Sequence, residues 1–200
     1  MAETVVIVEN DASDKSTVAS CGAGNGAFNS EGLEMNMTER LLRHDASTTR
    51  NLLDRSLELT DEQLDREFDI GHRSLRRTFL HIIGNMECWC DLMAGQPQQT
   101  HSSPGGHAAI SDLIVRLDAV AAKLLVLGKR VVDERRGDDF FVDYLDKPPR
   151  RKPLGAGLLH VATHGMHHRA QCLYLMRLLG MTDLPEGDPL SWDTRRRGSN

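Results

Sequence analysis

The chain has 200 residues, of which 40% are hydrophobic and 26% are charged, and its formal net charge is −5. These values are ordinary for one globular domain, and the acidic balance argues against a generally nucleic-acid-binding surface. No apolar run approaches the roughly 20 residues that a membrane helix needs, so we expect no membrane contact. The four cysteines match no zinc-finger spacing and no secretory signal is visible, so we expect reduced thiols in the cytoplasm.

Residues 1–36 differ in composition from the rest of the chain. After the short apolar run TVVIV they are rich in Gly, Ser, Asn and Asp, and they show neither helical nor strand periodicity. We therefore predict a flexible N-terminal extension over residues 1–36. A single domain is expected over residues 37–193, followed by a polar C-terminal tail over residues 194–200.

Four long helices are predicted after this extension. Apolar residues recur every three or four positions in four segments, which are residues 38–59, 75–94, 108–132 and 155–179. A charged, proline-containing connection separates the last two, with an extended segment expected at residues 140–144. Four long helices with one long crossover describe an all-α four-helix bundle.

Local signals support the predicted helix ends. The sequence TDEQ at Thr60–Gln63 is a capping-box pattern that starts a short helical piece. Ser74 can cap the second long helix, and Gly180 can end the fourth. The stretch TDLPEGDPLSWD that follows is predicted to be rich in turns. The basic runs Arg73–Arg77 and Arg195–Arg197 are interpreted as a solvated face and a solvated tail.

Histidine is concentrated in the fourth helix, where the sequence HVATHGMHHRAQ holds four of the nine histidines. His160, His164 and His168 are four residues apart and therefore lie on one stripe, with His167 and Gln171 in the same sector. Two histidines at this spacing can hold one divalent ion. The zinc-protease pattern fails, because glycine stands where that pattern needs glutamate. A buried polar network is the alternative interpretation.

The second helix carries a matching polar stripe. Ser74, Thr78, His81, Asn85 and Cys88 are spaced by four, three, four and three residues, and none of them is charged. A solvated helix face normally carries Lys, Glu or Arg. This stripe is therefore interpreted as one wall of a cleft that contains a single histidine, although a chance lack of charge would look the same.

The sequence SLRRTFLHIIGNMECWCDLM, followed downstream by HVATHGMHHRAQCLYLMRLLG, resembles the DinB/YfiT-like family, which is unrelated to the DNA polymerase of that name. The resemblance covers most of residues 38–193 and includes LLRHDASTTRNLL, LTDEQLDREF and DPLSWD. It implies an up-down-down-up four-helix bundle. Carried over by motif, it implies a divalent metal held by His81, His164 and His168. Ala170 replaces a glycine of the common family pattern, and this change should not disturb the ligands.

Three imidazole ligands would leave a position open for water or substrate, as in catalytic metal sites. Imidazole suits zinc, nickel, iron or copper, and we expect zinc or nickel. The resemblance implies either transfer or isomerisation that uses a low-molecular-weight thiol, or hydrolysis of a small molecule; it also implies a homodimer. The alternatives are a non-catalytic metal-binding stress-response bundle that acts through a partner and, with less support, a nucleic-acid-associated protein.

Further residues are candidates to support such a site. Three could hydrogen-bond the outer ring nitrogens of the ligands, namely Asn85, Glu87 and Gln171. His160 could line the pocket or carry protons, and His44 of the first helix could face the same cavity. Arg169 lies on the back of the fourth helix, where a structural ion pair is expected. His72 is interpreted as a loop residue without a function.

Overall fold

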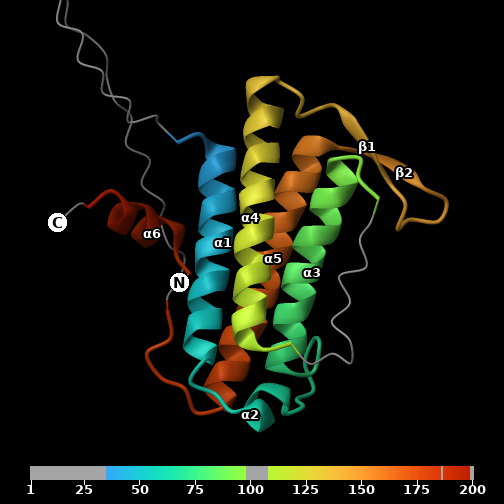
Figure 1. Ribbon diagram of the computed structural model, residues 1–200. Coiled ribbons are helices and arrows are strands. Elements are labelled where there is room, and N and C mark those ends of the chain that lie inside the picture. The colour runs from blue at the N-terminus through green and yellow to red at the C-terminus, as the bar shows by residue number, and fades with distance from the viewer. Residues whose placement is uncertain (1–34, 98–107, 186, 199–200) are drawn as a thin grey trace, which may run out of the picture. The chain divides into compact units, whose positions relative to one another are not determined.

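A computed structural model describes residues 35–97, 108–185 and 187–198. The predicted N-terminal extension lies outside the described residues, apart from Met35 and Asn36. Four long helices form a bundle (Figure 1), and they are α1 (Met37–Ser56), α3 (Leu75–Met93), α4 (Ile110–Asp133) and α5 (Leu154–Leu178). The predicted all-α four-helix bundle is confirmed. Among the described helices, none is long and apolar enough to cross a bilayer.

The helices follow the up-down-down-up order that the resemblance implies. In Figure 1, α1 and α5 run in one direction along the bundle, and α3 and α4 both run in the other. Each of α1 and α3 packs against both α4 and α5. α3 and α4 are parallel, and residues 98–107 of the connection between them lie outside the described part. The arrangement places α3 and α5, which carry the two polar stripes, side by side.

The predicted helix-start and helix-end signals are confirmed. Thr60 and Gln63 form a capping box at α2 (Asp61–Asp65), with backbone-to-side-chain distances of 2.9 and 3.3 Å. Ser74 caps α3 by accepting a hydrogen bond from the backbone of Arg77. Gly180 follows α5 with φ +87°, a left-handed conformation that glycine adopts without steric cost.

The core is built on the apolar side of α3. The predicted apolar residues of this helix are all buried, namely Leu75, Phe79, Ile82, Ile83, Met86, Cys90 and Met93. They form one cluster with apolar side chains of the other three long helices, including Leu53, Leu113 and Leu175. Burial of a large apolar side chain contributes about 1.5–3 kcal/mol. This cluster fixes α3 in rotation, so His81 on the opposite stripe faces His164 of α5; Ser74 and Thr78 of the same stripe are buried.

A β-hairpin fills part of the connection between α4 and α5. It consists of β1 (Phe140–Asp143) and β2 (Arg150–Pro153), which pair antiparallel with Phe140 opposite Pro153. The predicted extended segment is confirmed, whereas β2 was not predicted because its sequence is charged and contains proline. Phe141 packs edge-on against Trp89 of α3, with ring centroids 6.0 Å apart. This contact holds the hairpin against the end of α3 (Figure 1).

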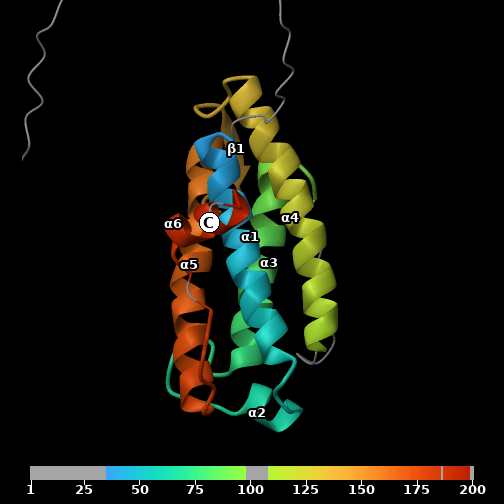
Figure 2. The ribbon, with the colours of Figure 1, turned by 90° about the vertical axis from the view of Figure 1, so that its left-hand side faces the viewer.

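The C-terminal segment contains a helix that was not predicted. The sequence suggested only turns, but α6 (Pro189–Arg196) forms with Asp188 as its N-cap. The carboxylate of Asp193 accepts a hydrogen bond from Arg40 of α1 at 2.6 Å, and α6 therefore lies on the outer side of α1 (Figure 2). A helix of two turns shows too little periodicity for recognition in the sequence, and its docking depends on a residue far along the chain.

Arg76 corrects the interpretation of Arg73–Arg77 as a solvated face. Only 2% of Arg76 is exposed. Its guanidinium pairs with Asp65 at 2.8 Å and with Asp61, and it donates a hydrogen bond to the backbone oxygen of Ala108 at 2.6 Å. Arg76 therefore joins α2, α3 and the start of α4.

Candidate metal centre

Three histidine side chains from α3 and α5 meet between these helices. His164 and His168 are one turn apart on α5, and His81 faces them from α3. The Nε2 atom of His164 lies 3.0 Å from Nε2 of His81 and 3.2 Å from Nε2 of His168. The structure therefore brings together the three residues that the sequence motif nominated as ligands.

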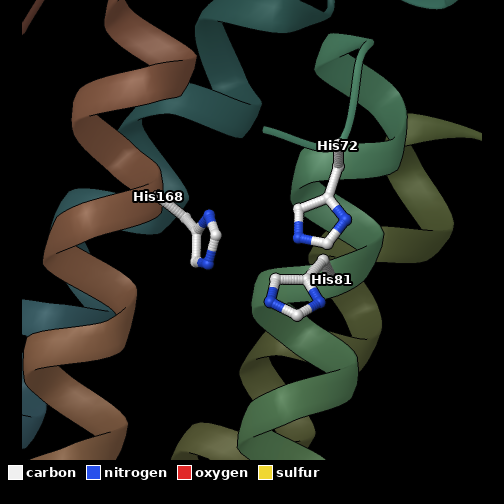
Figure 3. A group of neighbouring side chains, drawn as sticks. All are labelled: His72, His81 and His168. Atoms are coloured by element: carbon white, nitrogen blue, oxygen red, sulfur yellow. The ribbon is translucent and has the colours of Figure 1, made fainter. Parts of the chain in front are cut away.

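A fourth histidine, His72, joins this group from the connection that precedes α3. One ring nitrogen from each of His72, His81 and His168 lies within 4.8 Å of the others, and the three rings face one another (Figure 3). From the sequence, His72 was interpreted as a loop residue without a function. A histidine in a connection has no periodicity to link it to a helix stripe, and only its position two residues before the cap Ser74 could have indicated its proximity to His81.

The backbone around His72 is held in an unusual shape. Gly71 and Arg73, on either side, both have positive φ values, +49° and +70°. Backbone hydrogen bonds close the turn, from Phe68 N to Arg73 O at 2.7 Å and from Arg73 N to Ile70 O at 2.8 Å. A left-handed conformation at a non-glycine residue such as Arg73 costs of order 1 kcal/mol and persists only where surrounding contacts enforce it.

Gln171 orients His168 through a hydrogen bond. Its side-chain oxygen lies 2.9 Å from Nδ1 of His168, and its amide nitrogen lies 3.2 Å from Nε2 of His167. An amide oxygen can only accept, so Nδ1 of His168 carries the hydrogen and donates it. In the neutral ring, the lone pair is then on Nε2, which faces His164. This is the usual way in which a protein prepares histidine for a metal.

Burial keeps two of these rings neutral. Burial, together with smaller effects of the charges of His72 and His168, lowers the pKa of His81 to about 4. Burial, together with smaller effects of the charges of His168 and His81, lowers the pKa of His164 to about 3. The pKa of His72 is lowered mainly by burial as well. Because only neutral imidazole binds a metal, these shifts favour metal binding at neutral pH.

Asn85 lies one helical turn beyond His81 on α3. Its side-chain oxygen is buried and has no hydrogen-bond partner among the residues that the structure describes. Asn85 was expected to hydrogen-bond the outer ring nitrogen of a ligand histidine, and no such bond is present among the described residues. A buried amide oxygen without a partner is costly, so Asn85 carries an acceptor that no described group uses.

Glu87 and His44 are placed elsewhere, which corrects their candidate roles. The carboxylate of Glu87 binds Arg116 of α4 through two contacts of 2.6 and 3.0 Å. It therefore lies on the side of α3 that faces α4. His44 Nε2 donates a hydrogen bond to the backbone oxygen of Gly187, at 2.8 Å, and its ring packs edge-on against Trp192. The residues that bind Glu87 and His44 are distant from them in sequence, so the position of each side chain on its helix could not indicate these contacts.

His160 lies at the rim of the group. Its ring packs edge-on against Trp89 with centroids 4.9 Å apart, and it lies 5.5 Å from the ring of His164. His160 is exposed, whereas His168 is buried. Burial of part of the ring, together with the charge of Lys152, lowers the pKa of His160. The histidines of α5 thus extend from a buried end to an exposed end near the hairpin.

The back of α5 is fixed to α1 by the ion pair expected for Arg169. Its guanidinium binds the carboxylate of Asp45 and donates to Thr49 Oγ1 at 3.1 Å, and both charged residues are buried. Gly165 makes room for the pair, because a Cβ atom there would lie 2.4 Å from Asp45 Oδ1. Gly165, where a zinc protease has its glutamate, is thus required by packing.

The sequence model of the DinB family matches residues 35–191. The chain belongs to the DinB family. A DinB-like protein from Bacillus cereus has a similar crystal structure, with a TM-score of 0.58 and 21% sequence identity over 76% of this chain and 97% of that protein. At this identity the likeness concerns the fold. No protein with a curated description matches the chain.

The donor set of this DinB chain fits a transition metal. In a tetrahedral site with metal–nitrogen bonds of about 2.0–2.1 Å, the nitrogens are separated by about 3.3 Å. The Nε2 separations of 3.0 and 3.2 Å around His164 are close to this value. The group consists only of imidazole nitrogens, which suit zinc, nickel, copper or iron, whereas magnesium and calcium require oxygen ligands.

Proposed function

We propose that this DinB-family protein is a divalent-metal-dependent enzyme in which His81, His164 and His168 hold zinc or nickel. The single observation that carries the proposal is the convergence of the three Nε2 atoms, at 3.0 and 3.2 Å, around His164. The hydrogen bond from His168 to Gln171 and the low pKa values of His81 and His164 support it, because both prepare neutral rings for a metal.

The proposed reaction class is transfer or isomerisation with a low-molecular-weight thiol, with hydrolysis of a small molecule as the second possibility. When bound, the metal would supply a Lewis acid that lowers the pKa of a thiol or water. Among the protein residues, the amide of Asn85 can accept a hydrogen bond from a ligand in the site. The exposed ring of His160, which has a lowered pKa, can accept a proton at the rim.

The test begins with metal content, measured by mass spectrometry on untagged protein purified without chelator, beside His81→Ala and His164→Ala. We expect about one transition metal per chain in the parent protein and little in either variant. Thiol-transfer and hydrolase assays follow with the loaded protein. Absence of metal, even after reconstitution with zinc and nickel, would overturn the proposal.

The non-catalytic alternative is a metal-binding bundle that acts through a partner. One observation favours it, namely the fourth histidine, His72, which could leave no position for substrate. A loaded protein that binds neither thiols nor small anions at the metal would support this alternative.

We also propose, from the family resemblance, that the protein is a homodimer, which sedimentation analysis would test.

A further inference from the structure

The histidine group contains one more ring than the three-ligand motif requires. The ring of His72 stacks on that of His81, with centroids 3.7 Å apart and an angle of 27° between the planes, and it lies 5.2 Å from the ring of His168. A ring nitrogen of His72 is within 4.8 Å of nitrogens from both of these residues. Two imidazoles that bind one tetrahedral ion have ring centroids about 5 Å apart. The His72 ring therefore has to turn out of its stack on His81 to bring its nitrogen to the ion, which is a movement of the connection and not of a helix.

The connection that carries His72 is built against the ligand helices. A Cβ atom at Gly71 would lie 2.4 Å from the side-chain oxygen of Gln171, the same atom that accepts the hydrogen bond from His168. Arg73 adopts φ +70° and pairs with Glu67 at 2.9 Å. His72 is thus held between two left-handed residues: Gly71 lies against Gln171 of α5, and Arg73 forms an ion pair with Glu67. Such backbone strain is typical of positions that a site requires.

We propose that His72 is a fourth protein ligand, which completes a tetrahedral four-nitrogen site together with His81, His164 and His168. This inference rests on the proposed metal site and adds to it. Three ligands belong to helices, and only His72 belongs to a connection. A thiol or water that enters the site therefore competes with His72 for the metal, while the helix ligands retain it.

The test uses the full chain after removal of metal. Zinc affinity is measured by competition with a chromophoric chelator for the parent protein, for His72→Ala and for His44→Ala. The last variant is the control, because His44 contacts Gly187 and Trp192, outside the group. We expect His72→Ala to weaken zinc binding by 10- to 100-fold or more, whereas His44→Ala should bind as the parent protein does.

A second readout reports the coordination directly. Cobalt(II) is loaded into the parent protein and into His72→Ala, and the visible absorption bands are compared. We expect the bands to shift in His72→Ala and to return toward those of the parent protein when free imidazole is added, because imidazole can occupy the vacated position. His72→Gln, which preserves most of the side-chain volume, is the second variant if His72→Ala does not give folded protein by circular dichroism.

The possible outcomes separate the two proposals. Failure of the parent protein to bind zinc or cobalt would overturn the proposed function and this inference together. Tight binding by the parent protein, with unchanged affinity and an unchanged cobalt spectrum in the His72 variants, would overturn only the role of His72. Weaker binding with a shifted, imidazole-sensitive spectrum would establish His72 as the fourth ligand.

Discussion

The side-chain oxygen of Gln171 lies 2.9 Å from Nδ1 of His168, one helical turn earlier on α5. This hydrogen bond determines which nitrogen of His168 carries the hydrogen, and it leaves Nε2 to face His164. The same oxygen occupies the space above Gly71. One amide group therefore links the orientation of a proposed ligand to the connection that carries His72.

Replacement of Gln171 by leucine should weaken metal binding while the fold is retained. The acceptor for Nδ1–H of His168 is lost, and changes of this kind usually cost about 10- to 100-fold in metal affinity. Gln171→Glu is the matched control, because a carboxylate can accept the same hydrogen bond. Chelator competition measures both affinities. Equal affinities for the leucine variant and the parent protein would show that His168 needs no such support.

Gly71→Ala should weaken metal binding through Gln171. Alanine at this position is strained by φ +49°, and its Cβ would displace the side-chain oxygen that holds His168. Gly95→Ala is the matched control, since Gly95 has φ +66° but no neighbouring atom within 4 Å. Both variants should lose about 1 kcal/mol of folding free energy from the left-handed backbone.

The comparison of these two glycine variants separates strain from contact. Only Gly71→Ala should lose metal affinity, by about 10-fold or more if Gln171 leaves His168. Urea denaturation gives the stability of each metal-free protein, and zinc titration gives the affinity. A similar loss of affinity in Gly95→Ala would mean that general destabilisation, not Gln171, weakens the site.

Arg169→Met should destabilise the protein by about 3–5 kcal/mol, because the carboxylate of Asp45 remains buried without its charged partner. Urea denaturation of the metal-free protein measures this. The double variant Asp45→Asn/Arg169→Met should be more stable than the single variant. Arg43→Ala, which removes an exposed pair with Glu39, should cost less than about 1 kcal/mol. A loss for Arg169→Met as small as that for Arg43→Ala would contradict the packing described for α1 and α5.

Cys90 and Cys172 should resist alkylation in the folded protein. Burial raises the pKa of the Cys90 thiol to about 11 and also raises the pKa of Cys172. Because the thiolate is the reactive form, Cys90 should react roughly 100-fold more slowly than an ordinary thiol near pH 8. Labelling followed by peptide mass spectrometry measures each site, with protein in denaturant as the control. Rapid labelling of Cys90 in folded protein would indicate local opening of α3.

The sequence predicts those features of the site that follow helical periodicity. Periodicity places His160, His164 and His168 on one stripe of α5, and it places His81 on the side of α3 opposite the apolar residues. The choice of His81, His164 and His168 among these histidines is what the family resemblance implies. The capping residues Thr60 and Ser74 were predicted for a similar reason, since each acts on residues within one turn of itself.

The remaining features depend on contacts between distant parts of the chain. His72 reaches the group because a left-handed residue stands on either side of it, Gly71 and Arg73. Nothing in the sequence indicates a positive φ at an arginine. Glu87 was expected near the histidines, but Arg116 binds it on the other side of α3. α6 forms where Asp188 and Pro189 give a capping signal, which was not recognised because the helix is short and Arg40 lies far away in sequence.

The separation of His81 and His164 by 83 residues has a consequence for synthesis on the ribosome. At about 5–20 residues per second, the second of these histidines is made roughly 4–17 s after the first. During this interval the nascent chain holds only two of the four proposed ligands, His72 and His81, and α3 lacks the neighbour that completes the site. Capture of the proposed metal therefore has to follow the emergence of α5, and a chain truncated before this helix would lack two of the proposed ligands.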